Sequence, residues 1–221
     1  MARLPKIPYE IKNQIYYTLC EFGCARWKAL LIYAEAIAMR SLSLPGEIRE
    51  ERADSAGYKA LTSLLNEGRI EKREYGDEQI IVPAGVDPEL SFDSIYAFDA
   101  FSALVYEVAD ADQMPVLCYA GKAFNYPFHY IFTSGKQNIL YRVIVYGPDA
   151  FSRIGFLNST YNKSKDKSYV TMLVVPEVYT WEEFTDVYIA GKSRIAFIMK
   201  ANKANKTHKC LLTDIIEEEE Q

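Results

Sequence analysis

Residues 49–73 combine cationic, hydroxyl and aromatic side chains that could bind a nucleic acid. The members of this set are Arg49, Arg52, Tyr58, Lys59, Thr62, Arg69, Lys72 and Arg73. Guanidinium and ammonium groups neutralise phosphates, and side chains on the N-terminal part of a helix can reach base edges in the major groove. Acidic residues are interspersed with them, at Glu47, Glu50, Glu51, Asp54, Glu71 and Glu74. The pattern predicts binding to double-stranded DNA. The alternative is the charged, solvated face of a domain that binds protein.

Signatures of enzymatic chemistry are missing from the sequence. It contains no phosphate loop of the form G-x-x-x-x-G-K-[ST], no G-x-G-x-x-G and no G-x-S-x-G elbow. His129 lies among aromatic residues, which favours a packed histidine over a catalytic base, and His208 lies in a lysine-rich stretch. Cys20 and Cys24 are one helical turn apart, but no second pair follows at ligand spacing. We therefore expect no enzymatic activity, no cofactor and no bound metal.

Composition sets limits on the class of protein. The chain has 221 residues, of which 49% are hydrophobic, and this apolar content excludes a wholly disordered chain. With 11 Gly and 4 Cys it is neither collagenous nor a disulfide scaffold. The first residues hold no apolar signal region, and no apolar run approaches the roughly 20 residues that span a bilayer. We expect a cytoplasmic protein that does not contact a membrane. The net charge is −5 and neither half of the chain is basic, so phosphate binding requires a local concentration of cations.

The first 83 residues predict helices followed by a hairpin. Apolar residues at helical spacing predict a helix that ends before Gly23, and a second helix is expected from Ala25 to about Arg40. Ser55 is expected to cap a third helix, which ends at Gly68. Residues 69–75 and 79–83 alternate like strands around the turn at 76–77.

This order resembles a winged helix-turn-helix domain over residues 8–83. The resemblance is carried by the segment from Tyr58 to Ile70, in which Leu64, Gly68 and Ile70 match the L-x-x-x-G-x-I ending typical of the third helix of such domains. It implies a three-helix bundle with a hairpin wing. Many winged helices bind DNA and others bind only protein, so the resemblance is informative about the fold rather than the ligand.

A linker at residues 84–89 is expected to lead into a second domain. Amphipathic spacing predicts a helix over residues 91–109 and a short one over 150–157. Another helix is expected from Thr180, with Glu183 at capping-box spacing. Apolar runs predict strands at residues 114–119, 127–133, 139–146, 169–175, 195–199 and 210–215. Residues 217–221 form an acidic tail.

The expected order of helices and strands in this second domain resembles a restriction-endonuclease-like core. An active nuclease of that class needs an acidic residue near the second strand and an acid-x-lysine on the third, to hold a divalent metal and activate water. Residues 140–144 read Leu-Tyr-Arg-Val-Ile and supply neither. We expect a degenerate domain. A winged helix followed by such a domain resembles the replication-relaxation proteins of conjugative elements, and it is also similar to abortive-infection antitoxins.

Two further features leave alternatives open in the second half. Lysines and an arginine could form an anion-binding surface or protect a sheet edge, at Lys163, Lys165, Lys167, Lys192, Arg194, Lys200, Lys203, Lys206 and Lys209. Aromatic residues could stack on bases or pack against the sheet, with packing favoured, at Tyr126, Phe128, Tyr130, Tyr141 and Tyr146.

The sequence thus predicts an α+β protein with a winged helix-turn-helix domain at residues 1–84 and an α/β domain at residues 91–216. The predicted function is that of a non-enzymatic DNA-binding protein acting in replication, transfer or regulation of a mobile element. The first alternative is a protein-interaction module, antitoxin-like or a homodimerising adaptor, that uses the winged helix as a scaffold. The second is a metal-dependent nuclease.

Overall fold

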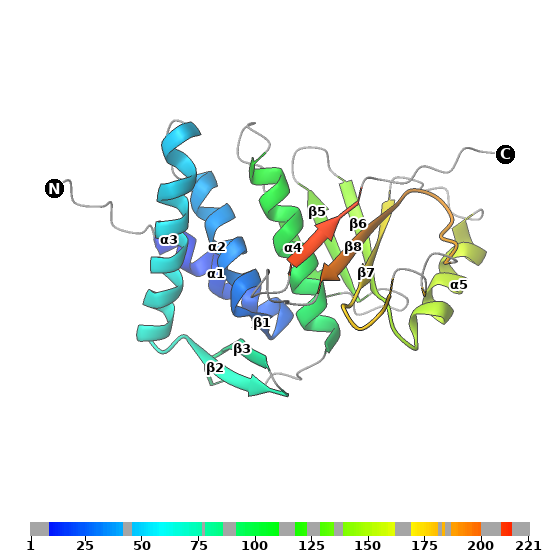
Figure 1. The fold of residues 1–221 in the computed structure, drawn as a ribbon, viewed down its shortest axis with the longest axis horizontal. Helices are drawn as coiled ribbons and strands as arrows, with labels where there is room; N and C mark the ends of the chain where they lie inside the picture. Colours follow the sequence, from blue (N-terminus) through cyan, green and yellow to red (C-terminus); the bar gives the residue numbers. More distant parts are fainter. Residues whose placement is uncertain are drawn as a thin grey trace. The chain divides into compact units, whose positions relative to one another are not determined.

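The computed structural model describes most of the chain. The residues described are 9–41, 46–76, 78–85, 92–110, 118–122, 129–134, 139–161, 169–180, 183, 187–199 and 209–213. They form an α+β fold, which confirms the predicted class; Figure 1 labels most of its helices and strands. The chain divides into two compact units. The first unit comprises residues 1–94 and 102–116, and the second comprises residues 95–101 and 117–221.

Up to residue 85, the described residues of the first unit form three helices and three strands. In chain order they are α1 (Tyr9–Phe22), β1 (Ala25–Arg26), α2 (Trp27–Ser41), α3 (Gly46–Asn66), β2 (Ile70–Tyr75) and β3 (Glu78–Pro83). The predicted first helix is confirmed. It buries Ile11, Ile15, Leu19 and Phe22 on one face, and Gly23 ends it with a positive φ of 81°.

Two predictions about this unit are wrong. The expected helix from Ala25 begins instead at Trp27, because Ala25 and Arg26 pair with Ile81 and Ile80 as strand β1. Ser55 does not cap the third helix, since α3 already begins at Gly46 and runs through it. The charged stretch before Ser55 is rich in good helix formers, which explains why the helix extends through it.

The hairpin and the glycine stop before it are confirmed. Gly68 has a φ of 65°, and its N–H donates to the Leu65 carbonyl at 3.0 Å, which ends α3. Strands β2 and β3 then pair antiparallel from Ile70↔Pro83 to Tyr75↔Glu78. Strand β1 adds to the other edge of β3, so the three-stranded antiparallel sheet has the order β1-β3-β2.

A mixed six-stranded sheet forms the second unit. Its strands are β4 (Cys118–Lys122), β5 (Tyr130–Ser134), β6 (Ile139–Val145), β7 (Tyr169–Val175), β8 (Ser193–Met199) and β9 (Lys209–Leu212), in that order across the sheet. Pairing is antiparallel from β4 to β6, parallel from β6 to β8 and antiparallel between β8 and β9. Helix α4 (Phe92–Asp110) precedes the sheet, and α5 (Ala150–Tyr161) connects β6 to β7.

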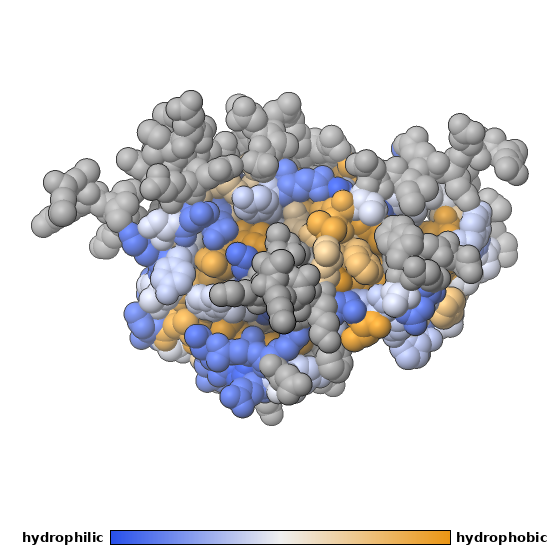
Figure 2. Space-filling model, in the orientation of Figure 1, coloured by the Kyte–Doolittle hydropathy of each residue, from blue (hydrophilic) through white to orange (hydrophobic). Residues whose placement is uncertain are grey.

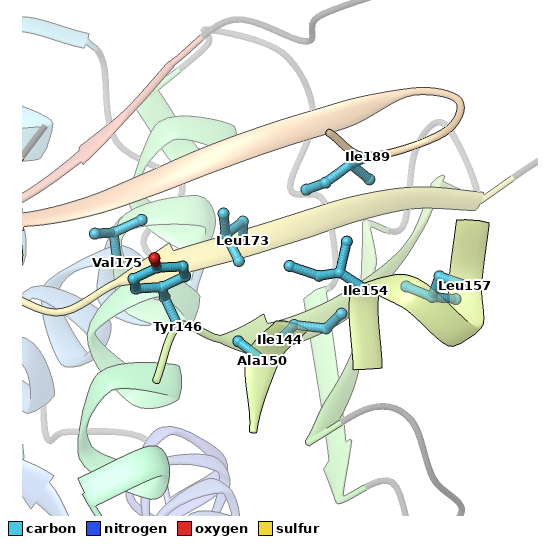
Figure 3. Close-up of a cluster of buried hydrophobic side chains, with 8 residues drawn as sticks. All are labelled: Ile144, Tyr146, Ala150, Ile154, Leu157, Leu173, Val175 and Ile189. Atoms are coloured by element: carbon cyan, nitrogen blue, oxygen red, sulfur yellow. The ribbon is translucent and has the colours of Figure 1, made fainter. Parts of the chain in front are cut away.

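Alternation along the strands divides the core of the second unit between two faces of the sheet. On one face, Phe132 of β5 lies opposite Tyr141 of β6, and its ring centroid is 5.0 Å from that of Phe101 in α4. On the other face α5 packs Ile154 against strand residues such as Ile144, as Figure 3 shows. The eight residues of this cluster are Ile144, Tyr146, Ala150, Ile154, Leu157, Leu173, Val175 and Ile189.

Most predicted elements of the second half are confirmed, including the helix at 91–109 and the strands at 139–146 and 169–175. The strand expected at 114–119 is wrong at its end, since the described strand continues to Lys122; its expected beginning lies outside the described residues, which resume at Cys118. Most of the linker and the acidic tail also lie outside it. Thr180 donates its backbone N–H to the Glu183 carboxylate, as the capping spacing predicted, although the rest of the helix expected there is not described.

Candidate nucleic-acid interface

Helix α3 exposes one face that carries three of the residues predicted to contact DNA. Its opposite face is buried, with Leu61 and Leu64 both 0% exposed. Tyr58 is 55% exposed and Lys59 is exposed, so both side chains can reach a ligand. Thr62 lies one turn further and donates its Oγ1 hydroxyl to the Tyr58 carbonyl at 2.9 Å. The Thr62 hydroxyl proton is therefore engaged, and its oxygen can still accept a hydrogen bond.

Trp27 connects this helix face to the hairpin. Its ring lies edge-on to that of Tyr58, with centroids 6.3 Å apart and planes at 88°. The Lys72 ammonium of β2 lies 5.2 Å from the centroid of the same indole ring. The structure thus brings Tyr58 and Lys72 together through a residue that sequence reasoning missed. The signal for it was a tryptophan directly ahead of a helical run and within a basic segment.

The hairpin presents its cations next to acids. Hydrophilic residues cover the hairpin in the lower part of the surface view in Figure 2. Arg73 forms an ion pair with Glu71, in which Nη2 lies 2.6 Å from Oε1 and Nε donates to the same oxygen at 2.8 Å. Lys72 is exposed on the opposite side of the strand. The charge of Arg73 is therefore partly compensated within the hairpin.

Arg69 makes its contacts with α1 instead. Its Nη1 donates to Asn13 Oδ1 at 3.0 Å, and its guanidinium lies 4.2 Å from the centroid of the Tyr16 ring. Both contacts use residues of α1, whereas Tyr58 and Lys72 contact Trp27. The predicted set is therefore divided among contacts with Trp27, contacts with α1 and, for Arg73, the ion pair with Glu71.

Arg49 and Arg52 lie on α3, but their side chains are outside the described part of the structure.

An ion pair also joins helix α1 to the C-terminal end of α3. Lys12 forms an ion pair with Glu67, and Ser63 Oγ donates to the same carboxylate at 2.7 Å. Hydrogen bonds from Lys12 and Ser63 lower the pKa of Glu67. Lys12 is therefore engaged in holding the bundle together.

A buried arginine fixes the start of the sheet. Arg26 is 6% exposed, and its Nε and Nη2 donate to Glu78 Oε2 and Oε1 at 2.8 and 3.3 Å. This bidentate pair joins β1 to the first residue of β3. Sequence reasoning did not single out Arg26, because its partner is distant along the chain.

Acidic groups lie close to the exposed face of α3. Burial raises the pKa of Glu35 in α2, and the neighbouring Asp54 carboxylate raises it further, while Lys28 acts in the opposite direction. Asp54 is exposed one turn before Tyr58. The described surface is therefore mixed in charge, and only a few of its cations are available to phosphates.

Side chains in the second unit are mostly committed to packing. Tyr130, Tyr141 and Tyr146 are buried, which supports packing over base stacking, while Tyr126 and Phe128 lie outside the described residues. His129 Nδ1 accepts a hydrogen bond from the Val145 N–H at 3.0 Å, as expected of a packed histidine.

The lysines and the arginine of the second half that could form an anion-binding surface do not form one among the described residues. Arg194 is 8% exposed, and its Nε donates to the Thr213 carbonyl at 2.9 Å. Lys192 is exposed, whereas Lys163, Lys165, Lys167, Lys200, Lys203 and Lys206 lie outside the described residues, as does the side chain of Lys209. Burial raises the pKa of the Cys210 thiol, which disfavours its thiolate form.

The described residues show neither a metal-binding cluster nor a membrane-spanning helix. Within this part of the chain, no group of three or more His, Cys, Asp or Glu side chains is placed to hold a metal ion. No described helix is both long and apolar enough to cross a lipid bilayer.

Comparisons with known proteins add no assignment. No model of a known protein family matches the chain, and no curated protein shows significant similarity to it. The geometry of the α3 and hairpin surface is therefore the main ground for a functional conclusion.

Proposed function

We propose that the first unit is a winged-helix domain that binds double-stranded DNA through α3 and the β2–β3 hairpin. The order helix, strand, helix, helix, strand, strand and the sheet order β1-β3-β2 support this architecture. In it α3 is the helix that enters the major groove and the hairpin is the wing that lies along the backbone.

A single observation carries the proposal. Tyr58 and Lys59 are exposed on α3, and Tyr58 shares Trp27 with Lys72 of the hairpin. Helix and hairpin thus present an aromatic ring and two ammonium groups on connected elements. Lysines of this kind contact phosphates, while the phenol of Tyr58 can donate to or accept from either a phosphate or a base edge.

We propose further that the second unit is a degenerate restriction-endonuclease-like domain without enzymatic activity. A helix, a three-stranded antiparallel meander, a second helix and a parallel strand follow one another in its chain order, as in that class. The third strand lacks the acid and the lysine of an active nuclease. From the resemblance of a winged helix followed by such a domain to replication-relaxation proteins, we infer a role in replication, transfer or regulation of a mobile element.

The test of DNA binding is fluorescence anisotropy with a labelled mixed-sequence duplex at two salt concentrations. Each phosphate contact contributes a slope of roughly −0.9 to log K against log salt. The surface offers few available cations, so we expect a slope of only about −2 to −4. An absence of binding at low salt refutes the proposal.

Two variants at one ion pair sharpen this test. Arg73→Glu reverses a cation of the hairpin and should weaken binding about tenfold or more, since one phosphate contact is replaced by repulsion. Glu71→Gln frees the Arg73 guanidinium from its intramolecular partner, and it should tighten binding by about two- to fivefold. If both variants bind as the wild type does, the Arg73 face of the hairpin makes no contact with DNA.

A role in binding protein is the second candidate, and α1 carries the observation that favours it. Tyr9 and Tyr17 are 68% and 63% exposed on this helix. Exposed tyrosines are frequent anchors of protein interfaces. Light scattering of the wild type and of Tyr17→Ser tests whether this face forms a homodimer.

A further inference from the structure

We propose that Trp27 is a positioning residue that joins α3 and the β2–β3 hairpin into one DNA-binding surface. The inference rests on the proposed function and adds to it a residue outside both DNA-contacting elements. Trp27 is the first residue of α2 and lies directly after β1.

The backbone on the N-terminal side of Trp27 is fixed to the hairpin. Arg26 pairs with Ile80 of β3 in the sheet, and its buried guanidinium holds Glu78 at the beginning of the same strand. The position of Trp27 relative to the hairpin is therefore determined by main-chain pairing and by a bidentate ion pair.

The backbone that follows Trp27 is fixed to α3. Helices α2 and α3 approach so closely at Gly57 that a Cβ built there lies 2.8 Å from the Glu35 backbone nitrogen. Close packing of the two backbones at this distance opposes sliding of α2 against α3. Trp27 thus lies between the segment that is paired with the hairpin and the helix α2 that packs against α3.

At this position the indole ring contacts Tyr58 of α3 and Lys72 of the hairpin. Its edge-on contact with Tyr58 is of the kind that aromatic pairs prefer, and the Lys72 ammonium lies within the range of a cation–π contact. Lysine loses much rotamer freedom on binding a phosphate. Holding Lys72 and Tyr58 in advance reduces that loss, so the ring increases affinity without touching the DNA.

The experiment compares Trp27→Leu, Trp27→Phe and Lys72→Met by anisotropy with the same duplex, with Tyr9→Leu as a control at an exposed aromatic residue of α1. We expect Trp27→Leu to weaken binding about three- to tenfold, in line with the loss of one cation–π and one aromatic contact. Trp27→Phe, which keeps an aromatic ring, should stay within about twofold of the wild type, and Tyr9→Leu should have no effect.

A double-mutant cycle separates positioning from a general structural role. In the Lys72→Met background, Trp27→Leu should lose part of its effect on affinity, since one of its two partners is gone. A merely structural Trp27 gives equal losses in both backgrounds. In a Trp181→Phe background Trp27 is the remaining tryptophan of the chain, and its fluorescence should change on DNA binding.

The outcomes distinguish this inference from the proposed function. If the wild type binds DNA in a salt-dependent manner while Trp27→Leu binds equally well, the positioning role is wrong and the DNA-binding proposal stands. If the wild type binds no duplex, the proposed function itself fails. If Trp27→Leu does not fold, the fluorescence of Trp27 in the Trp181→Phe protein decides, and emission that is unchanged on DNA binding overturns the inference.

Discussion

Replacement of Gly57 by alanine tests whether the crossing of α2 and α3 determines the fold of the first unit. Gly57 lies in the interior of α3, where alanine ordinarily stabilises a helix by about 1 kcal/mol relative to glycine. At this position the added Cβ lies 2.8, 3.0 and 3.1 Å from backbone atoms of Ala34 and Glu35. Contacts of this length with main-chain atoms can be relieved only by moving one helix.

The expected result of Gly57→Ala is a net loss of stability. Overpacking by a methyl group typically costs about 1–3 kcal/mol, and the rigid partner places this site at the upper end of that range. After the gain in helix propensity, we expect a net destabilisation of about 1–2 kcal/mol. In a domain of this size, that corresponds to a fall in Tm of about 5–12 °C.

The assay is thermal and urea unfolding followed by Trp27 fluorescence in a Trp181→Phe background, so that the signal reports on the first unit. Gly155→Ala is the matched control, because Gly155 lies within helix α5 and a Cβ there meets nothing within 4 Å. Circular dichroism should show that this control is as stable as the wild type or up to about 1 kcal/mol more stable. A Gly57→Ala protein that is stabilised like the control would refute the close crossing of α2 and α3.

Three further changes test the interior of each unit by urea denaturation. Glu78→Gln leaves the buried Arg26 guanidinium without its anionic partner and should destabilise by about 1–3 kcal/mol, whereas an unchanged midpoint contradicts the ion pair. Because the pKa of Glu35 is raised in the folded state, its ionisation disfavours folding as the pH rises above the ordinary glutamate value of about 4.3. Glu35→Gln should therefore lose less stability than the wild type between pH 4.5 and 7, and parallel pH profiles would show that Glu35 is not perturbed. Phe101→Ala removes the ring that packs on Phe132 and should destabilise the second unit by about 3–5 kcal/mol, while a cost below 1 kcal/mol would contradict the burial of Phe101.

Elements defined by local pattern were predicted well from the sequence. The helix that ends at Gly23 and the strands at residues 139–146 and 169–175 were recognised because apolar spacing or an apolar run is a property of the segment itself. The β2–β3 hairpin was recognised for the same reason, since its turn and its alternation lie within fifteen residues of one another.

Elements defined by distant partners were not predicted. Strand β1 has two residues, and it exists only because Ala25 and Arg26 pair with β3 far along the chain. The cap expected at Ser55 placed Gly57 near the beginning of the third helix. The structure shows that its missing side chain serves the contact with α2, which no local pattern reveals.

The predictions for the candidate site show the same distinction between local patterns and distant partners. Exposure of Tyr58 and Lys59 follows from helical periodicity, because the buried Leu61 and Leu64 fix which face of α3 is solvated. The contacts of Arg69 with α1 and the place of Trp27 between helix and hairpin depend on how the elements pack. Sequence reasoning could therefore name residues able to bind phosphate, but not which of them act together.

The charge pattern of β2 decides how the hairpin can bind an anion. Strand alternation places Glu71 and Arg73 on one face and Lys72 on the other, so each face holds a cation with a different competing partner. Arg73 is held by a carboxylate, which a phosphate must displace. Lys72 is held by the face of an indole ring, which leaves the outer side of its ammonium group free for a second anion. At Arg73 a phosphate gains only the difference between its own contact energy and that of the Glu71 carboxylate it displaces. At Lys72 the phosphate contact is added to the existing contact with the indole ring. On this ground we expect Lys72 to contribute more to DNA affinity than Arg73 does, until Glu71 is neutralised.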